Sequence, residues 1–142
     1  MEKGFLKQQK VDKLIYTKTK KMSKDYNVSE TPDQWVIVKI EQGGNALYKV
    51  FGSWFGGYLD GDRWKMNSGI SRVEEQEGYY YFFGYSGSCY KCSKKGYGTG
   101  NSYTSGVLQN VIDTIEKRDD GSVISIINEA AVDNIVKENR IQ

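Results

Sequence analysis

The sequence contains no histidine among its 142 residues, and this absence narrows the chemistry open to the protein more than any other feature of its composition. Histidine is the usual general base near neutral pH, the usual partner of a serine or cysteine nucleophile, and a common metal ligand. Most familiar hydrolytic and metal-dependent mechanisms therefore lack a residue on which they depend. We expect a protein that is not an enzyme and that uses no cofactor.

Cysteine is also scarce, because Cys89 and Cys92 are the only two in the chain. A zinc site needs about four ligands, and no further cysteine or histidine can supply them, so we expect no metal site within one chain. On a strand, residues three apart face opposite sides and lie too far apart for a disulfide. We expect two structural thiols, with a metal site between two chains or redox chemistry as alternatives.

Long hydrophobic runs are missing as well. The longest, such as residues 35–38 and 79–83, are far shorter than the roughly 20 residues of a membrane-spanning helix. The first residues have scattered charges and no apolar centre, unlike a secretory signal. We therefore expect a cytoplasmic protein with no membrane segment.

Glycine and aromatic residues, by contrast, are concentrated in the middle of the chain. Residues 35–103 hold 16 of the 19 aromatic residues, and residues 43–106 hold 14 of the 16 glycines. Alternation predicts strands at 35–41 and 47–51, joined by a glycine turn at 42–45. Further strands are expected at 64–73 with an interruption at 67–69, and then at 79–83 and 89–92.

The apolar pattern changes to a helical period after residue 103. Five apolar residues between Val107 and Ile115 predict a helix that lies on a core, with Thr104 or Ser105 as its N-cap. A short apolar run at 123–127 and a second helix capped by Asn128 follow. The order predicts an α+β fold in which an antiparallel meander of about five strands packs against the C-terminal helices.

Lysines crowd the start of the chain although the net charge is only +2. Residues 1–25 contain eight lysines and three acidic residues. We interpret residues 1–30 as a basic arm or frayed helix, and residues 31–142 as a single α+β domain. The arm is either a solvated tail or a means of attracting nucleic acid or an acidic protein face, through Lys7, Lys10, Lys13, Lys18, Lys20 and Lys21.

The aromatic residues suggest a binding surface as well as a core. Tyrosine, tryptophan and arginine are the residues enriched in the hot spots of interfaces, and base stacking uses similar side chains. Core packing, protein binding and nucleic-acid or nucleotide binding remain as readings of this set. The candidate binding residues are Trp54, Phe55, Tyr58, Arg63, Trp64, Lys65, Arg72, Tyr79 and Tyr81.

Three phrases of the sequence, at residues 48–58, 62–70 and 84–92, resemble a group of small uncharacterised proteins of tailed bacteriophages. The resemblance covers roughly residues 35–112 and rests on glycines at matching corners rather than on a catalytic signature. Similar proteins often have a histidine after the second cysteine position, where this chain has Ser93 and Lys94. The resemblance implies a phage accessory protein, in a class rich in proteins that bind and inhibit host machinery or defence systems.

These observations favour a non-enzymatic protein that binds a host or defence-system protein in the host cytoplasm. The alternative is a nucleic-acid or nucleotide-binding protein that uses the basic arm and stacked aromatic residues. Among the carboxylates, Asp60 and Asp62 lie nearest to the aromatic loop in sequence, and they are the candidates if the protein is an enzyme after all. The sequence does not predict the oligomeric state.

Overall fold

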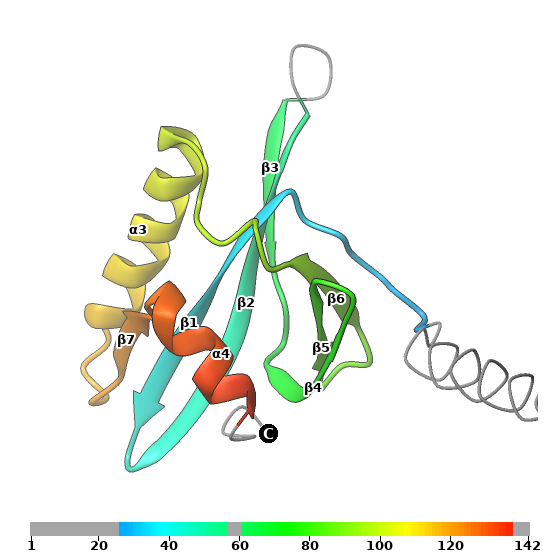
Figure 1. The fold of residues 1–142 in the computed structure, drawn as a ribbon. Coiled ribbons are helices and arrows are strands. Elements are labelled where there is room, and N and C mark those ends of the chain that lie inside the picture. The colour runs from blue at the N-terminus through cyan, green and yellow to red at the C-terminus, as the bar shows by residue number, and fades with distance from the viewer. Residues whose placement is uncertain (1–25, 57–60, 138–142) are drawn as a thin grey trace, which may run out of the picture.

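Figure 1 shows the computed structural model of the protein, which describes residues 26–56 and 61–137. The predicted α+β class is confirmed, since the described residues form seven strands and two helices. Of the predicted arm at residues 1–30, residues 1–25 lie outside the described residues, and Tyr26 and Glu30 contact the second sheet. In chain order the elements are β1 (Gln34–Gln42), β2 (Asn45–Phe55), β3 (Asp62–Met66), β4 (Ile70–Gln76), β5 (Tyr79–Gly84), β6 (Cys89–Ser93), α3 (Ser102–Glu116), β7 (Val123–Ile126) and α4 (Glu129–Lys137).

The strands form two antiparallel sheets. The first sheet has the order β3-β2-β1-β7, and the second has the order β4-β5-β6. The first hairpin follows the prediction, because Gly43 and Gly44 have positive φ and Gln42 pairs with Asn45. Each sheet contains one three-stranded meander, and β7 returns from the far end of the chain to pair with β1.

The strand expected at residues 64–73 is divided between the two sheets at residues 67–69. The side chain of Asn67 is buried, and its Oδ1 accepts a hydrogen bond from the N–H of Val50 at 2.9 Å. Gly69 has a φ of 136°, and a Cβ there would lie 2.7 Å from Cδ1 of Leu47. This corner therefore needs glycine, and it turns the chain from the first sheet into the second.

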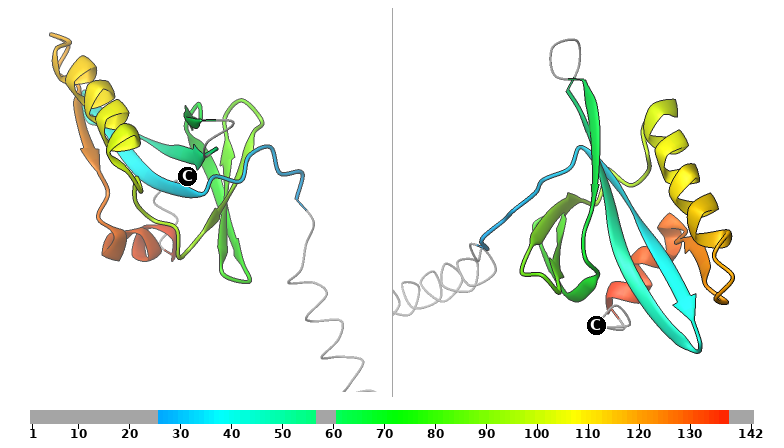
Figure 2. Two further views of the ribbon diagram at one scale, coloured as in Figure 1. Left: turned by 90° about the horizontal axis from the view of Figure 1, so that it is seen from above. Right: turned by 180° about the vertical axis from the view of Figure 1, so that it is seen from behind.

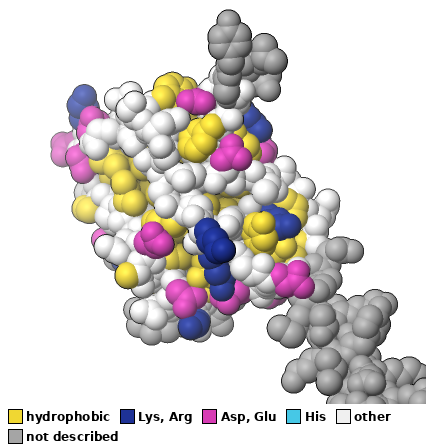
Figure 3. Space-filling view, turned by 45° about the horizontal axis from the view of Figure 1, so that its top comes forward, with side chains coloured by type: hydrophobic (Ala, Val, Ile, Leu, Met, Phe, Trp, Pro, Cys, Tyr) yellow, Lys and Arg dark blue, Asp and Glu magenta, His cyan; other side chains and the backbone are white. Residues whose placement is uncertain are grey.

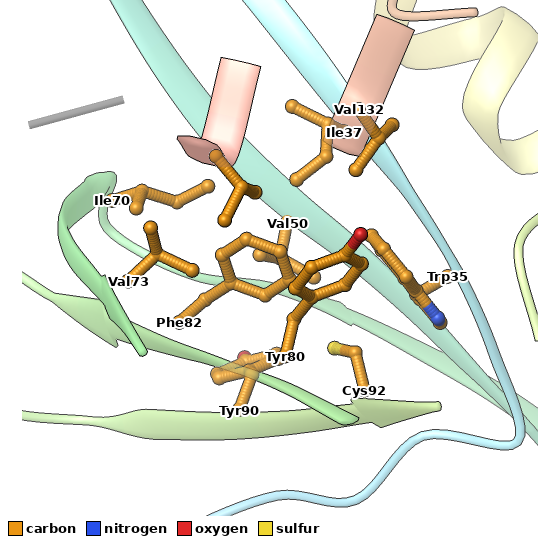
Figure 4. Packing of buried hydrophobic residues seen from close by; sticks show 11 residues of the cluster. Trp35, Ile37, Val50, Ile70, Val73, Tyr80, Phe82, Tyr90, Cys92 and Val132 are labelled. Carbon is orange, nitrogen blue, oxygen red and sulfur yellow. The ribbon is translucent and has the colours of Figure 1, made fainter. Parts of the chain in front are cut away.

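The two sheets pack face to face around the larger core. Trp35, Ile37 and Val50 of the first sheet meet Tyr80 and Phe82 of the second (Figure 4). We expected the C-terminal helices to cover one face of the aromatic strand β5; that face is covered chiefly by the first sheet, with α4 contributing at one side.

Helix α3 covers the other face of the first sheet, so the molecule has a layer of helix and two layers of strand (Figure 2). Leu108 and Ile115 of α3 pack with Val36 and Val38 of β1. Strand β1 is covered on both sides, which explains its continuous apolar run. Neither helix of the described part of the chain is long and apolar enough to cross a membrane.

The helix starts were predicted with mixed success. Asn101, not Thr104 or Ser105, caps α3, because its side chain accepts a hydrogen bond from the N–H of Thr104 and the helix begins three or four residues earlier than expected. Asn128 stands directly before α4 as predicted, and its Oδ1 accepts from the N–H of Ala130 at 2.9 Å.

Candidate binding groove

The predicted binding residues lie on different faces of the two sheets. Trp54 and Arg63 are opposite each other on β2 and β3, and the guanidinium carbon lies 4.3 Å from the centre of the indole ring. The indole Nε1 donates a hydrogen bond to the carbonyl oxygen of Thr31. This pair is therefore held largely by contacts within the protein, on the face of the first sheet that α3 does not cover.

Phe55 and Lys65 also have partners within the protein. The main-chain N–H of Phe55 donates to Oδ2 of Asp33 at 2.8 Å, and 36% of the residue is exposed. The ammonium of Lys65 pairs with Glu30 at 2.8 Å. Tyr58, a further predicted site residue, lies outside the described residues.

Three predicted residues lie on the outer face of the second sheet. The guanidinium of Arg72 lies 4.0 Å from the ring centre of Phe83, and the ammonium of Lys91 lies 4.5 Å from that of Tyr79. Tyr81 is only 6% exposed, because Tyr26 packs on it with ring centres 4.7 Å apart. The expected outward tyrosine is thus buried at position 81, and the eight predicted residues that the structure describes do not form one surface.

Trp64 faces the α3 side of the first sheet and borders an open groove. Its ring is stacked on that of Phe51, with the planes 15° apart, yet 40% of the residue is exposed. The groove has a volume of about 460 Å³. Its lining residues come from the sheet and from one side of α3: Ile40, Lys49, Trp64, Met66, Val107, Asn110, Val111, Thr114, Ile115 and Arg118.

The apolar stripe of α3 is wider than the part of it that is buried in the core. The remaining apolar residues of the stripe form the helical wall of the groove. Leu108 and Ile115 are buried in the core, whereas Val107 and Val111 are only half-buried. The five apolar positions between residues 107 and 115 span about 140° of the helix, against about 100° for an ordinary core-facing stripe. This width was a signal in the sequence, but we interpreted the whole stripe as core.

Two cations stand at the groove. Lys49 comes from β2 and Arg118 from the end of α3, and neither forms a salt bridge with a carboxylate of the described residues. The groove therefore combines an apolar wall, an exposed indole and positive charge. On the surface shown in Figure 3, exposed hydrophobic side chains lie in separate patches with charges of both signs between them.

A smaller hollow of about 170 Å³ lies beside α4, and both of its tyrosine hydroxyls form hydrogen bonds. The hydroxyl of Tyr80 donates to Asp133 at 2.7 Å, and that of Tyr97 donates to the carbonyl of Ile127. Burial, together with Asp133, raises the pKa of Tyr80, and Lys137 and Tyr80 lower the pKa of Asp133. These contacts join α4 to the sheets.

The two cysteines are buried on opposite faces of β6, as the spacing predicts. Cys92 faces the core between the sheets. Cys89 lies beside residues 29–30, whose main-chain N–H groups donate to its carbonyl oxygen. Burial raises the pKa of both thiols, so they are protonated at neutral pH. Within residues 26–56 and 61–137, no group of three or more histidine, cysteine, aspartate or glutamate side chains is placed to hold a metal ion.

The other predicted residues are divided between the described and the undescribed parts of the chain. The carboxylate of Asp62 accepts a hydrogen bond from Nδ2 of Asn101 at 2.9 Å, which ties β3 to the start of α3. Asp60 lies outside the described residues, as do Lys7, Lys10, Lys13, Lys18, Lys20 and Lys21.

Comparison with protein-family models, with curated proteins and with solved structures found no match to this chain. The candidate site therefore rests on its geometry.

Proposed function

We propose that the protein is a non-enzymatic binding protein of the phage accessory type, which inhibits a host or defence-system protein by occupying part of its surface. The groove between α3 and β3 receives the partner. On this proposal the protein acts in the cytoplasm of the host cell. The resemblance of roughly residues 35–112 to small phage proteins supports the class, and the groove supports the mode of action.

The exposed indole of Trp64 at an apolar groove is the observation that carries the proposal. Most other aromatic side chains of the predicted site are engaged by neighbouring residues, as Trp54 is by Arg63 and Tyr81 by Tyr26. Tryptophan is among the residues most enriched in interface hot spots, and such residues contribute most when a partner removes water from around them. Trp64 combines that side chain with 40% exposure and a rigid stack on Phe51.

The proposal is tested by capture from host extract, followed by titration of the purified partner. Trp64→Ala should weaken binding by about 2 kcal/mol, or roughly 30-fold, because the substitution removes the indole from the groove. Tyr85→Ala is the matched control, since Tyr85 is 64% exposed but lies between β5 and β6, away from the groove. Equal affinities of the Trp64→Ala variant and the unmodified protein for a specific partner would overturn the assignment of the groove.

A further inference from the structure

The outer edge of β3 presents main-chain hydrogen-bonding groups beside the groove. The N–H of Asn67 donates to Val50 at 3.1 Å, and the N–H of Gly56 donates to Gly61 at 2.9 Å. In an antiparallel pair, alternate residues direct their main-chain groups toward the partner strand. Residues 63 and 65 therefore face β2, and the main-chain groups of Asp62, Trp64 and Met66 point away from it.

Strand β3 is one edge of the first sheet, and no strand of the described part of the chain pairs with that outer side. The residues with outward main-chain groups are also the ones whose side chains lie on the α3 face. Met66 pairs with Phe51, which packs against α3, and Trp64 pairs with Ser53, two residues further along the same face. A strand added to β3 would place alternate side chains on the same face. Those side chains would enter the groove against Val107 and Val111.

We propose that β3 accepts an extended segment of the partner as an additional strand, with apolar side chains in the groove and acidic side chains at the alternate positions. This inference rests on the proposed function and specifies the chemistry of the partner. Addition of a strand to a free sheet edge is a common mode of peptide recognition, in which main-chain hydrogen bonds supply affinity and pockets for alternate side chains supply specificity.

The charges around β3 select an acidic partner. Arg63 projects from the face opposite the groove, where it lies over Trp54, has no salt bridge with a described carboxylate and would meet the alternate side chains of the added strand. Lys65 lies on the same face but is already paired with Glu30. On the groove side, Lys49 and Arg118 form no salt bridge with a described carboxylate. A second copy of this chain fits poorly, because antiparallel pairing of two β3 strands would bring the cations of one copy against those of the other.

Two of the other three edges of the described sheets, at β6 and β7, differ from β3. The edge at β6 is already paired in parallel with residue Glu30, since the N–H of Lys91 donates to the carbonyl of Glu30 at 2.9 Å. Strand β7 has only four residues, and very short strands are one way in which proteins protect a sheet edge. Strand β3 combines an unpaired edge with a groove lined by its own side chains.

The direct test uses a synthetic peptide with the sequence acetyl-Glu-Val-Glu-Ile-Glu-Val-amide and the ¹⁵N-labelled protein. The peptide should shift the amide resonances of Trp64 and Met66 and slow their hydrogen exchange by about tenfold. Ile124 and Ile126 of β7 are the internal control, because the hydrogen bond from the N–H of Ile127 to Ile37 places their main-chain groups on the other edge of the same sheet.

Two control peptides separate the parts of the inference. A peptide of the same composition with its three acidic residues adjacent loses the alternation, and one with lysine in place of glutamate reverses the charge. Both should bind at least about tenfold more weakly than the alternating peptide. Equal binding of the rearranged peptide, or binding that leaves the exchange of Trp64 and Met66 unchanged, would overturn strand addition.

A pair of variants isolates the main-chain contribution and distinguishes this inference from the proposed function. Met66→Ala removes the side chain from the groove, whereas Met66→Pro also removes the outward N–H, and proline is tolerated at strand edges. Circular dichroism and thermal unfolding check that both variants fold. The proline variant should bind the peptide and the captured partner at least about fivefold more weakly than the alanine variant. If the two bind equally while Trp64→Ala still weakens binding, the groove stands as the site and strand addition fails.

Discussion

Similar aromatic side chains are covered on the outer face of the second sheet and left partly exposed on the α3 face of the first. Each sheet has a face with aromatic residues and nearby cations, but residues 26–30 cover part of the outer face of the second sheet, and α3 leaves a groove open on the first. Tyr26 packs on both Tyr81 and Phe83, with ring centres 4.7 Å and 5.4 Å apart. Trp64 has no such cover among the described residues. Aromatic composition therefore marks candidate surfaces, and the path of the neighbouring chain decides which of them remains available.

The cations at the groove also differ from those on the outer face of the second sheet. On the outer face of the second sheet, Arg72 and Lys91 lie over aromatic rings, and Arg72 also pairs with Glu74 at 3.1 Å. At the groove, Lys49 and Arg118 have no salt bridge with a described carboxylate. The first arrangement stabilises the protein itself, and the second leaves positive charge available to a partner.

The largest expected effect comes from breaking the core that joins the sheets. Phe82→Ala removes a fully buried ring between them and should lower the free energy of unfolding by about 3–5 kcal/mol. Urea unfolding of the variant measures this loss, with Tyr85→Ala as the exposed control. A loss below about 1 kcal/mol would mean that the two sheets are stable without each other.

Removing the cover of the second sheet should have a smaller effect. Tyr26→Ala deletes two aromatic contacts, each of which contributes about 0.5–1.5 kcal/mol beyond burial, so we expect a loss of about 1–3 kcal/mol in urea unfolding. The outer face would then resemble the open face of the first sheet, and Tyr81 should become accessible to iodination. Unchanged stability together with an unreactive Tyr81 would contradict the comparison of the two faces.

Alkaline titration distinguishes the covered tyrosines from those of the unfolded chain. Burial raises the pKa of Tyr90 and of Tyr97 from 10.0 to about 12. Because the folded state keeps these phenols protonated and the unfolded state ionises them near pH 10, stability is fully present below pH 10 and falls as the pH rises toward 12. Phenolate absorbance in native and denaturing buffer measures this. Ionisation of every tyrosine near pH 10 in the folded protein would refute it.

Deletion of residues 1–25 should have the smallest effect on partner binding. The groove residues all lie between Ile40 and Arg118, so affinity for the captured partner should stay within about twofold of that of the full chain. If the alternative function holds, the same deletion should weaken nucleic-acid binding strongly. The slope of log affinity against log salt should then fall by about 0.9 for each phosphate contact that is lost. Loss of partner binding on deletion would move the site from the groove to the basic arm.

The sequence by itself determined most of the strands and helices of this protein, and it showed that the chain has no histidine and only two cysteines for catalysis or metal binding. Alternation over residues 35–41, the turn at Gly43 and Gly44, the aromatic strand 79–83 and the helical period after residue 103 all depend on neighbours within about four positions, which a sequence displays directly. The two glycines accept positive φ wherever they stand. The α+β class follows from the order of these elements.

Only the tertiary structure decided which surfaces stayed open. The division of strands at residues 67–69 depends on a bond between Asn67 and Val50, and the burial of Tyr81 depends on Tyr26, which is 55 positions away in the chain. The exposure of Trp64 depends on how far α3 reaches across the sheet. Each outcome depends on packing between distant segments, and the hydrophobic effect that drives such packing is non-directional. Local patterns therefore predicted which side chains prefer burial, and the fold decided which of them a neighbouring segment covers.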